Sequence, residues 1–388
     1  MPRIASILVC VARVPLDHVT SFATRTVTGR DYCLVKVRAV DGTEGIGFCY
    51  AGSTGGNVAR VAVEELLAPR LIGEDSSRVE GLWEEMYREA LLQGRAGSVM
   101  RAISALDTAL WDLNSRGSGL PLYRYLGSWA KDTVPAYASG GYYLEGKTPR
   151  DLGVEMGSYV QQGFKAVKIK VGRLTPEAEE ERVRATREAI GENVELMLDA
   201  NNAWTDLPTA LLYCKRFEKY NPYWIEEPFS PDDIDNHAKL AARTSILVAT
   251  GEIEAGRWRF KELLDKRAAE ILQADAAVCG GISEWRRIAQ TAASYGVTIC
   301  PHWFHDLHAH LVASVPNARY VEFFADDQVL NFRRLINRQL QVKEGALLLP
   351  QTPGLGFEFD EQAVAKYGLS RGQAWTVVTQ QAGSSLTF

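Results

Sequence analysis

Three acidic residues stand where three consecutive β-strands are predicted to end. Asp199 and Glu226 each end a short apolar run, and Glu252 follows such a run by two residues. Carboxylates that converge on one point repel each other unless a cation lies between them. The set offers only oxygen ligands, which favours a hard ion such as Mg²⁺ over zinc. The sequence therefore predicts a Mg²⁺ site with coordination positions left for water and substrate.

Two polar neighbours of these acids are assigned differently. Asn201 lies two residues after Asp199, where its amide is predicted to orient ligands or substrate. Glu227 directly follows Glu226. Because successive side chains of a strand face opposite sides, Glu227 is predicted to point away from the metal and is left out of the ligand set.

Lys168 and Lys170 are separated by one residue on a predicted strand. Their side chains are therefore expected on the same side of the strand. Two neighbouring ammonium groups disfavour each other's charge, which would lower a lysine pKa toward neutrality, as a general base requires. The alternative is a pair of solvent-exposed lysines.

Four of the six histidines lie within nine residues. His302 directly follows a predicted strand, and we predict that it is an acid/base group paired with Asp275, at the end of the adjacent strand. The carboxylate would fix the tautomer and favour the imidazolium. The spacing of His305, His308 and His310 fits no simple zinc pattern, so these three are predicted to lie on the surface of a loop or helix.

Ser139 and Glu322 flank this set on the first and last predicted strands. Each could hydrogen-bond a substrate carboxylate or its developing oxyanion, Glu322 only if it is protonated. A structural role is the alternative for both.

All of these residues belong to one repeating pattern of strands and helices. Apolar runs alternate with amphipathic stretches such as 176–190 and 282–295. Eight such repeats predict a parallel sheet closed into a barrel, whose strand ends line a single mouth. The residues from Lys170 to Glu322 are spaced by 20 to 29 positions, about one repeat, so they are predicted to converge. The apolar runs are 134–139, 166–170, 196–199, 223–226, 246–250, 271–273, 297–300 and 320–323.

The regions on either side of the barrel predict a second, α+β unit. The first 125 residues contain expected strands at 4–13, 32–40 and 45–50 and expected helices at 58–71, 79–89 and 96–116. The strand-like run 347–349 and Gly-Leu-Gly at 354–356 indicate a return to this unit. The predicted fold is thus an α/β TIM barrel of the (β/α)7β type, residues 126–345, with an α+β capping domain built from residues 1–125 and the C-terminal segment 346–388.

Composition excludes several other classes of protein. The 388 residues carry a formal charge of −5, which argues against a nucleic-acid binder. The longest apolar runs fall short of eighteen residues, so no membrane span is expected. The apolar start at 4–12 is interpreted as a strand rather than a signal segment, because Arg13 follows at once. Six scattered cysteines without a C-x-x-C pair indicate reduced thiols in a cytoplasmic protein.

The motifs at the strand ends, taken in order, resemble those of the enolase superfamily and of its mandelate racemase subgroup. The resemblance covers essentially the whole chain and includes the cap. The motifs are Val-Lys-Ile-Lys (167–170), Leu-Asp-Ala-Asn (198–201), Trp-Ile-Glu-Glu-Pro (224–228), Gly-Glu (251–252), Ala-Asp (274–275) and Pro-His (301–302).

The resemblance implies a shared first step and a role for each residue. A base removes the proton α to a carboxylate, and Mg²⁺ stabilises the resulting enediolate. A homo-oligomer is implied as well. The implied roles are metal binding for Asp199, Glu226 and Glu252, the base on one face for Lys170 with Lys168 beside the carboxylate, the acid/base on the other face for His302 with Asp275, and carboxylate binding for Ser139 and Glu322.

The predicted function is a Mg²⁺-dependent sugar-acid dehydratase, a carbon–oxygen lyase. Lys170 or His302 would take the α-proton, the enediolate would expel the β-hydroxyl with help from His302, and tautomerisation would give a 2-keto-3-deoxy acid. A racemase or epimerase of an α-hydroxy acid is the alternative, because it needs bases on both faces. The third hypothesis, a barrel that binds a sugar acid without catalysis, has no need of both bases and all three metal ligands.

Departures from the subgroup patterns narrow this prediction. The segment 274–284 contains no lysine, which argues against cycloisomerases, succinylbenzoate synthases and dipeptide epimerases. Asn201 stands where some dehydratases, such as galactonate dehydratase, place a catalytic histidine. Its presence therefore argues against the substrates of those particular dehydratases. Specificity is expected in loops around 16–30 and 50–56. Polar cap residues there suit a polyol: His18, Thr20, Thr24, Arg25, Thr26 and Tyr50.

Overall fold

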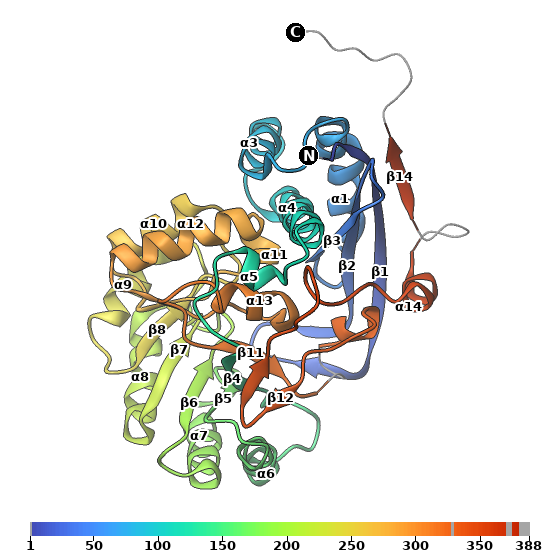
Figure 1. The fold of residues 1–388 in the computed structure, drawn as a ribbon. Coiled ribbons are helices and arrows are strands. Elements are labelled where there is room, and N and C mark those ends of the chain that lie inside the picture. Colours follow the sequence, from blue (N-terminus) through green and yellow to red (C-terminus); the bar gives the residue numbers. More distant parts are fainter. Residues whose placement is uncertain (1, 327–329, 370–374, 380–388) are drawn as a thin grey trace.

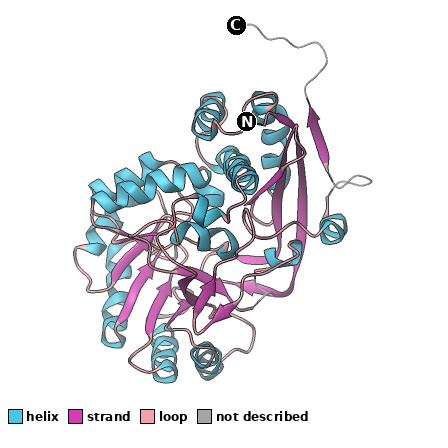
Figure 2. Cartoon of the chain, viewed as in Figure 1, coloured by secondary structure: helices cyan, strands magenta, loops and turns pink. Residues whose placement is uncertain are grey.

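The computed structural model describes residues 2–326, 330–369 and 375–379. Its longer strands form an antiparallel capping sheet and a separate barrel sheet (Figure 1). The capping sheet has the strand order β14-β1-β2-β3. Figure 2 shows the helices of this region gathered mainly on the side of the sheet toward the barrel. The strands of the capping sheet are β1 (Ile4–Ser21), β2 (Thr26–Ala39), β3 (Glu44–Tyr50) and β14 (Thr376–Thr379).

β1 and β2 extend further than the sequence predicts. The expected loop around 16–30 is instead the far half of a long hairpin, in which Pro15 and Thr20 still pair with β2. A register shift between these two residues interrupts the side-chain alternation by which a strand is recognised in sequence. The hairpin reaches the barrel, where Ser21 forms an antiparallel bridge with Tyr143.

The cap helices follow their expected ranges closely. One of them, α4, lies directly against β3. Glycines at positions 45 and 47 of β3 allow the helix backbone to approach this closely. The helices are α1 (Gly56–Val61), η1 (Ala62–Leu67), α2 (Ala68–Leu71), α3 (Val79–Glu89), α4 (Gly97–Gly117) and α5 (Leu122–Tyr125).

Replacing Gly47 by Ala is expected to lower the free energy of unfolding by about 3 kcal/mol or more. A Cβ atom at this position would lie 1.9 Å from the carbonyl oxygen of Ala105, a backbone atom inside a buried helix. The matched control is Gly117→Ala in the last turn of α4, where the added methyl meets nothing within 4 Å. Urea unfolding should separate the two variants; equal stability would contradict the close packing of α4 on β3.

The barrel has the predicted (β/α)7β architecture. Strands β4 to β10 form consecutive parallel pairs, and β11 pairs with β4. A parallel bridge between Ile299 and Ala318 closes the ring beside β11. The elements are β4 (Thr133–Ser139), α6 (Pro149–Gln161), β5 (Ala166–Lys170), α7 (Pro176–Ile190), β6 (Glu195–Asp199), α8 (Leu207–Phe217), η2 (Glu218–Tyr220), β7 (Pro222–Glu226), α9 (Ile234–Ala241), β8 (Leu247–Thr250), α10 (Arg257–Asp265), β9 (Ile271–Leu272), α11 (Ala276–Cys279), α12 (Gly281–Ser294), β10 (Thr298–Ile299), α13 (His305–Val312) and β11 (Val321–Phe324).

The inside of the barrel is a packed core below a polar mouth. One buried cluster takes a single residue from each strand or from the position next to it. Because strand side chains alternate, the residues two positions further along face the same interior, nearer the mouth. On β4, β5 and β7 these are Ser139, Lys168 and Glu226. The buried cluster consists of Tyr137, Ala166, Met197, Trp224, Ala249, Ile271, Cys300 and Tyr320.

The C-terminal segment contacts both parts of the molecule. β13 (Ala346–Leu348) forms a hairpin with β12 (Val342–Lys343) and pairs with β4 of the barrel, so the strand-like run 347–349 does not join the cap as expected. Further along, α14 (Glu361–Tyr367) contacts β1, and β14 pairs with β1. The domain limits drawn from the sequence stay a prediction. Among the described residues, no helix has the length and apolarity that a membrane crossing requires.

The histidines of α13 are buried, which corrects the prediction of a surface position. α13 packs between β11 and α5, so its polar residues are enclosed on several sides (Figure 1). His310 accepts a hydrogen bond from the backbone N–H of Tyr123 (3.1 Å) at Nδ1, and its Nε2 donates to the carbonyl oxygen of Leu355 (3.1 Å). These contacts hold His310 as the neutral imidazole at the junction of α5, α13 and the C-terminal segment.

The protein is expected to lose stability in mild acid through His310. Burial lowers the pKa of His310 from 6.5 to about 4. Between pH 6.5 and pH 4 the unfolded chain therefore binds a proton at His310 that the folded protein does not. Its neutral form stabilises the fold above pH 6.5, and this contribution is lost as the pH falls toward 4. The total loss is on the order of 3 kcal/mol. The variant His310→Gln should be less stable at pH 7.5 but show a flatter pH dependence between 6.5 and 4.5. If the free energy of unfolding falls equally with pH in the variant and in the unmodified protein over this range, the assignment is contradicted.

Candidate active site

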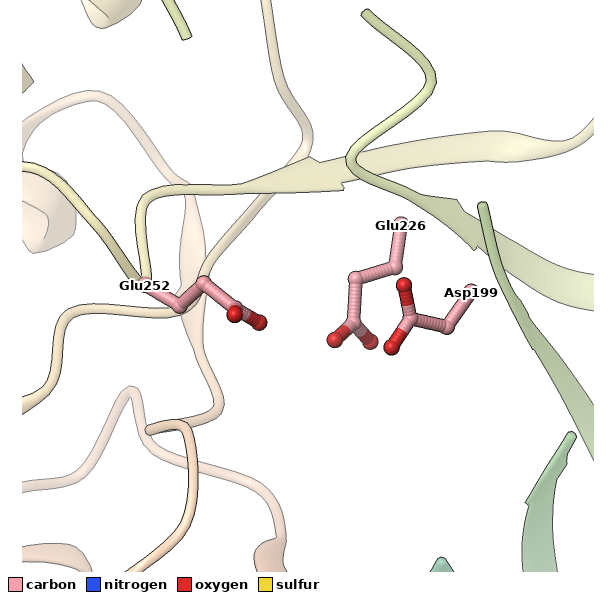
Figure 3. Close-up of side chains that lie close together, drawn as sticks. All are labelled: Asp199, Glu226 and Glu252. Carbon is pink, nitrogen blue, oxygen red and sulfur yellow. The ribbon is translucent and has the colours of Figure 1, made fainter. Parts of the chain in front are cut away.

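Asp199, Glu226 and Glu252 come together at the carboxyl ends of β6, β7 and β8 (Figure 3). One oxygen atom of each residue lies within 4.8 Å of those of the other two. Asp199 accepts a hydrogen bond from the backbone N–H of Asn201 (2.9 Å), and Glu226 accepts one from the indole of Trp224 (3.1 Å). Glu252 Oε2 is buried with no hydrogen-bond partner among the described residues. The donor set therefore fits a hard cation such as Mg²⁺.

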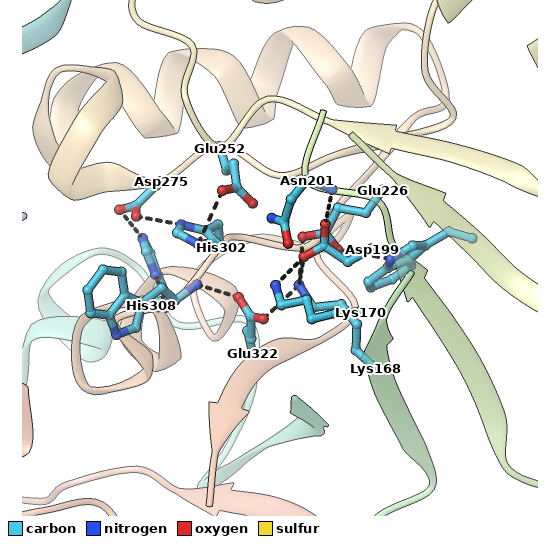
Figure 4. A network of polar contacts seen from close by, with 12 residues as sticks. Lys168, Lys170, Asp199, Asn201, Glu226, Glu252, Asp275, His302, His308 and Glu322 are labelled. Carbon is cyan, nitrogen blue, oxygen red and sulfur yellow. Dashed lines mark hydrogen bonds and ion pairs between the residues drawn. The ribbon is translucent and has the colours of Figure 1, made fainter. Parts of the chain in front are cut away.

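Lys168 and Lys170 face the same interior, as expected, and both are buried among acids (Figure 4). The Lys168 ammonium lies 2.6 Å from Glu226 and 2.7 Å from Glu322. The Lys170 ammonium pairs with Asp199. Lys168 is completely enclosed, whereas Lys170 reaches the cavity above the cluster.

The expectation of lowered lysine pKa values is wrong for this arrangement of charges. Burial lowers the pKa of Lys170, but Asp199, Tyr142 and Glu226 together outweigh burial and raise this pKa. For Lys168, Glu226 and Glu322 outweigh burial in the same way. The sequence shows that the two lysines are neighbours, but the cross-strand acids that pair with them become apparent only in the fold. A cation bound to the carboxylates would offset their charge and reduce this effect on Lys170.

His302 and Asp275 form the predicted pair on the other side of the acidic cluster from Lys170 (Figure 4). His302 Nδ1 lies 3.0 Å from Asp275 Oδ2, and its Nε2 lies 3.6 Å from Glu252 Oε1. His308 supports the pair from below, since its Nδ1 donates to the carbonyl of Trp303 and its Nε2 accepts from the N–H of Ala276 (3.0 Å). His308 thereby ties the backbone after His302 to the backbone after Asp275.

The charge state of His302 follows from these neighbours. Burial lowers the pKa of His302, but Glu252 and the hydrogen bond to Asp275 outweigh burial and raise it to about 9. The contact with Asp275 favours the imidazolium, as the sequence predicts, and leaves Nε2 on the side of Glu252 as the nitrogen that can donate a proton.

The remaining predicted site residues are Asn201, which lines the cavity, and Glu322 and Ser139, which are buried. Asn201 lines the cavity, in a backbone conformation with a φ of 44° that carries its side chain out of the strand pattern. Glu322 does not bind as predicted, because Lys168 and the N–H of Trp303 (2.8 Å) occupy its oxygens. Burial raises the pKa of Glu322, but Lys168, His302 and Lys170 together outweigh burial and lower this pKa to about 2, which favours the carboxylate. Ser139 is buried, and its hydroxyl has no partner among the described residues.

A cavity of about 140 Å³ lies over this cluster, between barrel and cap. Lys170, Glu252 and His302 line it from the barrel. Glu227 lines it as well, because its φ of 41° turns the chain out of the strand pattern, so it does not point away as predicted. Of the six polar cap residues proposed for substrate contact, only Arg25 and Tyr50 reach this cavity.

Sequence reasoning missed several lining residues. Arg30, Arg101 and Tyr142 contribute to the wall of the cavity, as does Trp303 next to His302. The arginines come from β2 and α4 of the cap, whose placement over the barrel no local motif reveals. The sequence of β2 does not single out Arg30 either, because a second charged residue, Asp31, follows it directly.

Comparison with known proteins places the chain in a family. Residues 4–127 match the mandelate racemase/muconate lactonizing enzyme N-terminal domain, and residues 151–363 match the enolase C-terminal domain-like family. The chain therefore belongs to the mandelate racemase/muconate lactonizing enzyme family of the enolase superfamily.

Three relatives show the range of reactions in this family. The arabinonate dehydratase of Saccharolobus solfataricus is 35% identical over 339 residues, 86% of this chain and 89% of the relative. The L-talarate dehydratase from Polaromonas sp. JS666, solved in complex with Mg and L-glucarate, has a TM-score of 0.87 and 32% identity, covering 98% of this chain and all of that one. The D-galactarolactone cycloisomerase of Agrobacterium fabrum is 32% identical over 365 residues, 91% of this chain and 95% of the relative.

Proposed function

We propose that the protein is a Mg²⁺-dependent dehydratase that converts a sugar acid into a 2-keto-3-deoxy acid. The observation that carries this proposal is the three-carboxylate cluster with Lys170 on one side and the His302–Asp275 pair on the other. The similarity to arabinonate dehydratase and to L-talarate dehydratase solved with Mg and L-glucarate supports this reaction.

Asp199, Glu226 and Glu252 would hold the metal ion. Bound there, Mg²⁺ would supply the positive charge that stabilises the enediolate form of the substrate carboxylate. Lys168 would neutralise Glu226 and Glu322 below the site and so fix the geometry of the cluster. Asn201 would contact substrate from the cavity wall.

Proton transfer would be divided between the two sides of the cavity. Lys170, in its neutral form, would accept the α-proton, because it is the buried amine that reaches the cavity. His302, protonated at neutral pH, would donate a proton to the β-hydroxyl oxygen as the carbon–oxygen bond breaks and water leaves. Tautomerisation of the resulting enol would then give the 2-keto-3-deoxy acid. Asp275 and His308 would keep the imidazole oriented throughout.

A racemase or epimerase of an α-hydroxy acid is the second candidate, because acid/base groups on both sides of the cavity also suit proton exchange between two faces. A barrel that only binds a sugar acid would have no need of Lys170 and His302 as acid/base groups on the two sides of the cavity. We further propose a homo-oligomer and a cytoplasmic location; six buried, unpaired cysteines support the latter.

The test is a panel of aldonic and aldaric acids incubated with the enzyme and Mg²⁺, with keto-acid formation followed by a carbonyl reagent. Keto acid from at least one acid, lost with EDTA and restored by Mg²⁺, is the expected result. Substrate recovered unchanged from the whole panel, although it raises the melting temperature, would favour the non-catalytic binder and contradict the proposal.

A further inference from the structure

Arg182 is a buried arginine of α7 that takes no part in the proposed mechanism. Its side chain is 4% exposed, and α7 follows β5 along the chain and packs on the outside of the barrel (Figure 1). Its Nη2 donates one hydrogen bond to the carbonyl oxygen of Lys170 (3.1 Å) and another to that of Gly141 (2.8 Å). One guanidinium nitrogen therefore joins the carboxyl end of β5 to the segment that follows β4.

Both carbonyls belong to segments that surround the Lys170 ammonium. Tyr142 directly follows Gly141 and lines the cavity, and its ring centre lies 5.2 Å from this ammonium. Lys170 reaches the same cavity from the last position of β5. The hydrogen bonds from Arg182 thus hold the backbone that carries the lysine and the backbone that carries its aromatic neighbour.

The guanidinium is also held on its other side. Its Nε forms an ion pair with Glu179 Oε2 (3.3 Å), and its carbon atom lies 4.3 Å from the ring centre of Tyr143. Glu179 accepts hydrogen bonds from the backbone N–H groups of Arg173 and Leu174 (2.9 Å each), so the loop after β5 belongs to the same network. A buried cation needs such a partner, and the pairing sets the orientation of Arg182 before any substrate binds.

We propose that Arg182 is a positioning residue for the base, which sets the place of the Lys170 ammonium relative to the α-carbon without touching substrate. This inference rests on the proposed function, in which Lys170 accepts the α-proton. Proton transfer requires the two partners to be within hydrogen-bond reach, and a displacement of about 1 Å can lower a rate about 100-fold. Loss of the guanidinium would leave two buried carbonyls without this donor and free the end of β5 to move.

The test uses Arg182→Met, which keeps an unbranched apolar stem but removes the charge and the donors. The matched control is Arg187→Met, on the same helix. Arg187 is 5% exposed, and it too donates to backbone carbonyls, among them those of Val194 (2.7 Å) and Gly191 (2.8 Å). These carbonyls precede β6, at the end of the barrel opposite the mouth.

Arg182→Met is expected to lower kcat about 10- to 100-fold on the acid identified by the screen, with little change in KM. Arg187→Met should lose stability as well, because it also leaves buried carbonyls without a donor, but its kcat should stay within about threefold. Equal losses of kcat in the two variants would show a general effect of packing and would overturn the inference.

Exchange of the α-proton with solvent gives a second readout. His302→Asn is expected to retain this exchange through Lys170. Adding Arg182→Met should slow the exchange about as much as it lowers kcat, whereas adding Arg187→Met should not. Undiminished exchange in the first double variant would overturn the positioning role.

Arg182→Lys provides a test if Arg182→Met does not fold. It keeps the positive charge beside Glu179 but lacks the planar guanidinium, so it should show a smaller loss of kcat than Arg182→Met and a larger one than Arg187→Lys. A kcat equal to that of Arg187→Lys would contradict the inference.

Failure of the proposed function would give a different result. If the unmodified protein produced neither keto acid nor α-proton exchange from any acid of the panel, the proposed function itself would be contradicted. Turnover by the unmodified protein with the same kcat in Arg182→Met would overturn the positioning role alone and leave dehydration standing.

Discussion

The variants Lys170→Ala and His302→Asn are each expected to lower kcat by about 10³-fold or more, with the fold intact. Lys170 is the amine that reaches the cavity, and His302 is the imidazolium on the opposite side, so neither has a substitute in position. Steady-state kinetics on the acid identified by the screen measures the loss. Matched controls are Lys165→Ala and His18→Asn, two exposed residues, for which kcat should stay within about twofold.

The two variants should differ in the partial reaction that they retain. If Lys170 removes the α-proton, His302→Asn still exchanges this proton with solvent, whereas Lys170→Ala does not. The reverse pattern would assign proton removal to His302. Full kcat in either variant would contradict its place in the catalytic machinery.

Removal of a metal ligand is the second large expected effect. Glu226→Gln and Asp199→Asn should weaken Mg²⁺ binding by more than about 100-fold, since even residues outside the coordination shell change metal affinity 10- to 100-fold. Each variant also leaves Lys168 or Lys170 without its nearest carboxylate. Isothermal titration with Mg²⁺ measures affinity, and kcat should fall in parallel.

A thermal readout makes this prediction independent of activity. In the unmodified protein, Mg²⁺ at 100 times its dissociation constant should stabilise the fold by about 2.7 kcal/mol, and the melting temperature should rise accordingly. The control Glu188→Gln, on an exposed face of α7, should behave like the unmodified protein. If Mg²⁺ raised the melting temperature of Glu226→Gln as much as that of the unmodified protein, the assignment of the metal site would be contradicted.

The barrel and the converging acids could be predicted because both follow from a local pattern. A strand of four to six apolar residues that ends in Asp199, Glu226 or His302 can be recognised in sequence, and barrel closure places all such ends at one mouth. What could not be predicted depends on contacts between distant segments. The ion pair between Lys168 and Glu322 joins β5 and β11, the second and eighth strands of the barrel. Arg101 reaches the cavity only because α4 packs on the barrel.

The most direct test of the account is an NMR experiment on turnover of the best substrate of the panel in D₂O with Mg²⁺. The predicted result is a 2-keto-3-deoxy acid with one deuterium at C3, because tautomerisation takes a proton from solvent after the α-proton and the β-hydroxyl have left. Deuterium at the α-carbon of an otherwise unchanged acid, or of its epimer, with no keto acid formed, would contradict dehydration and show that the site exchanges protons between two faces instead.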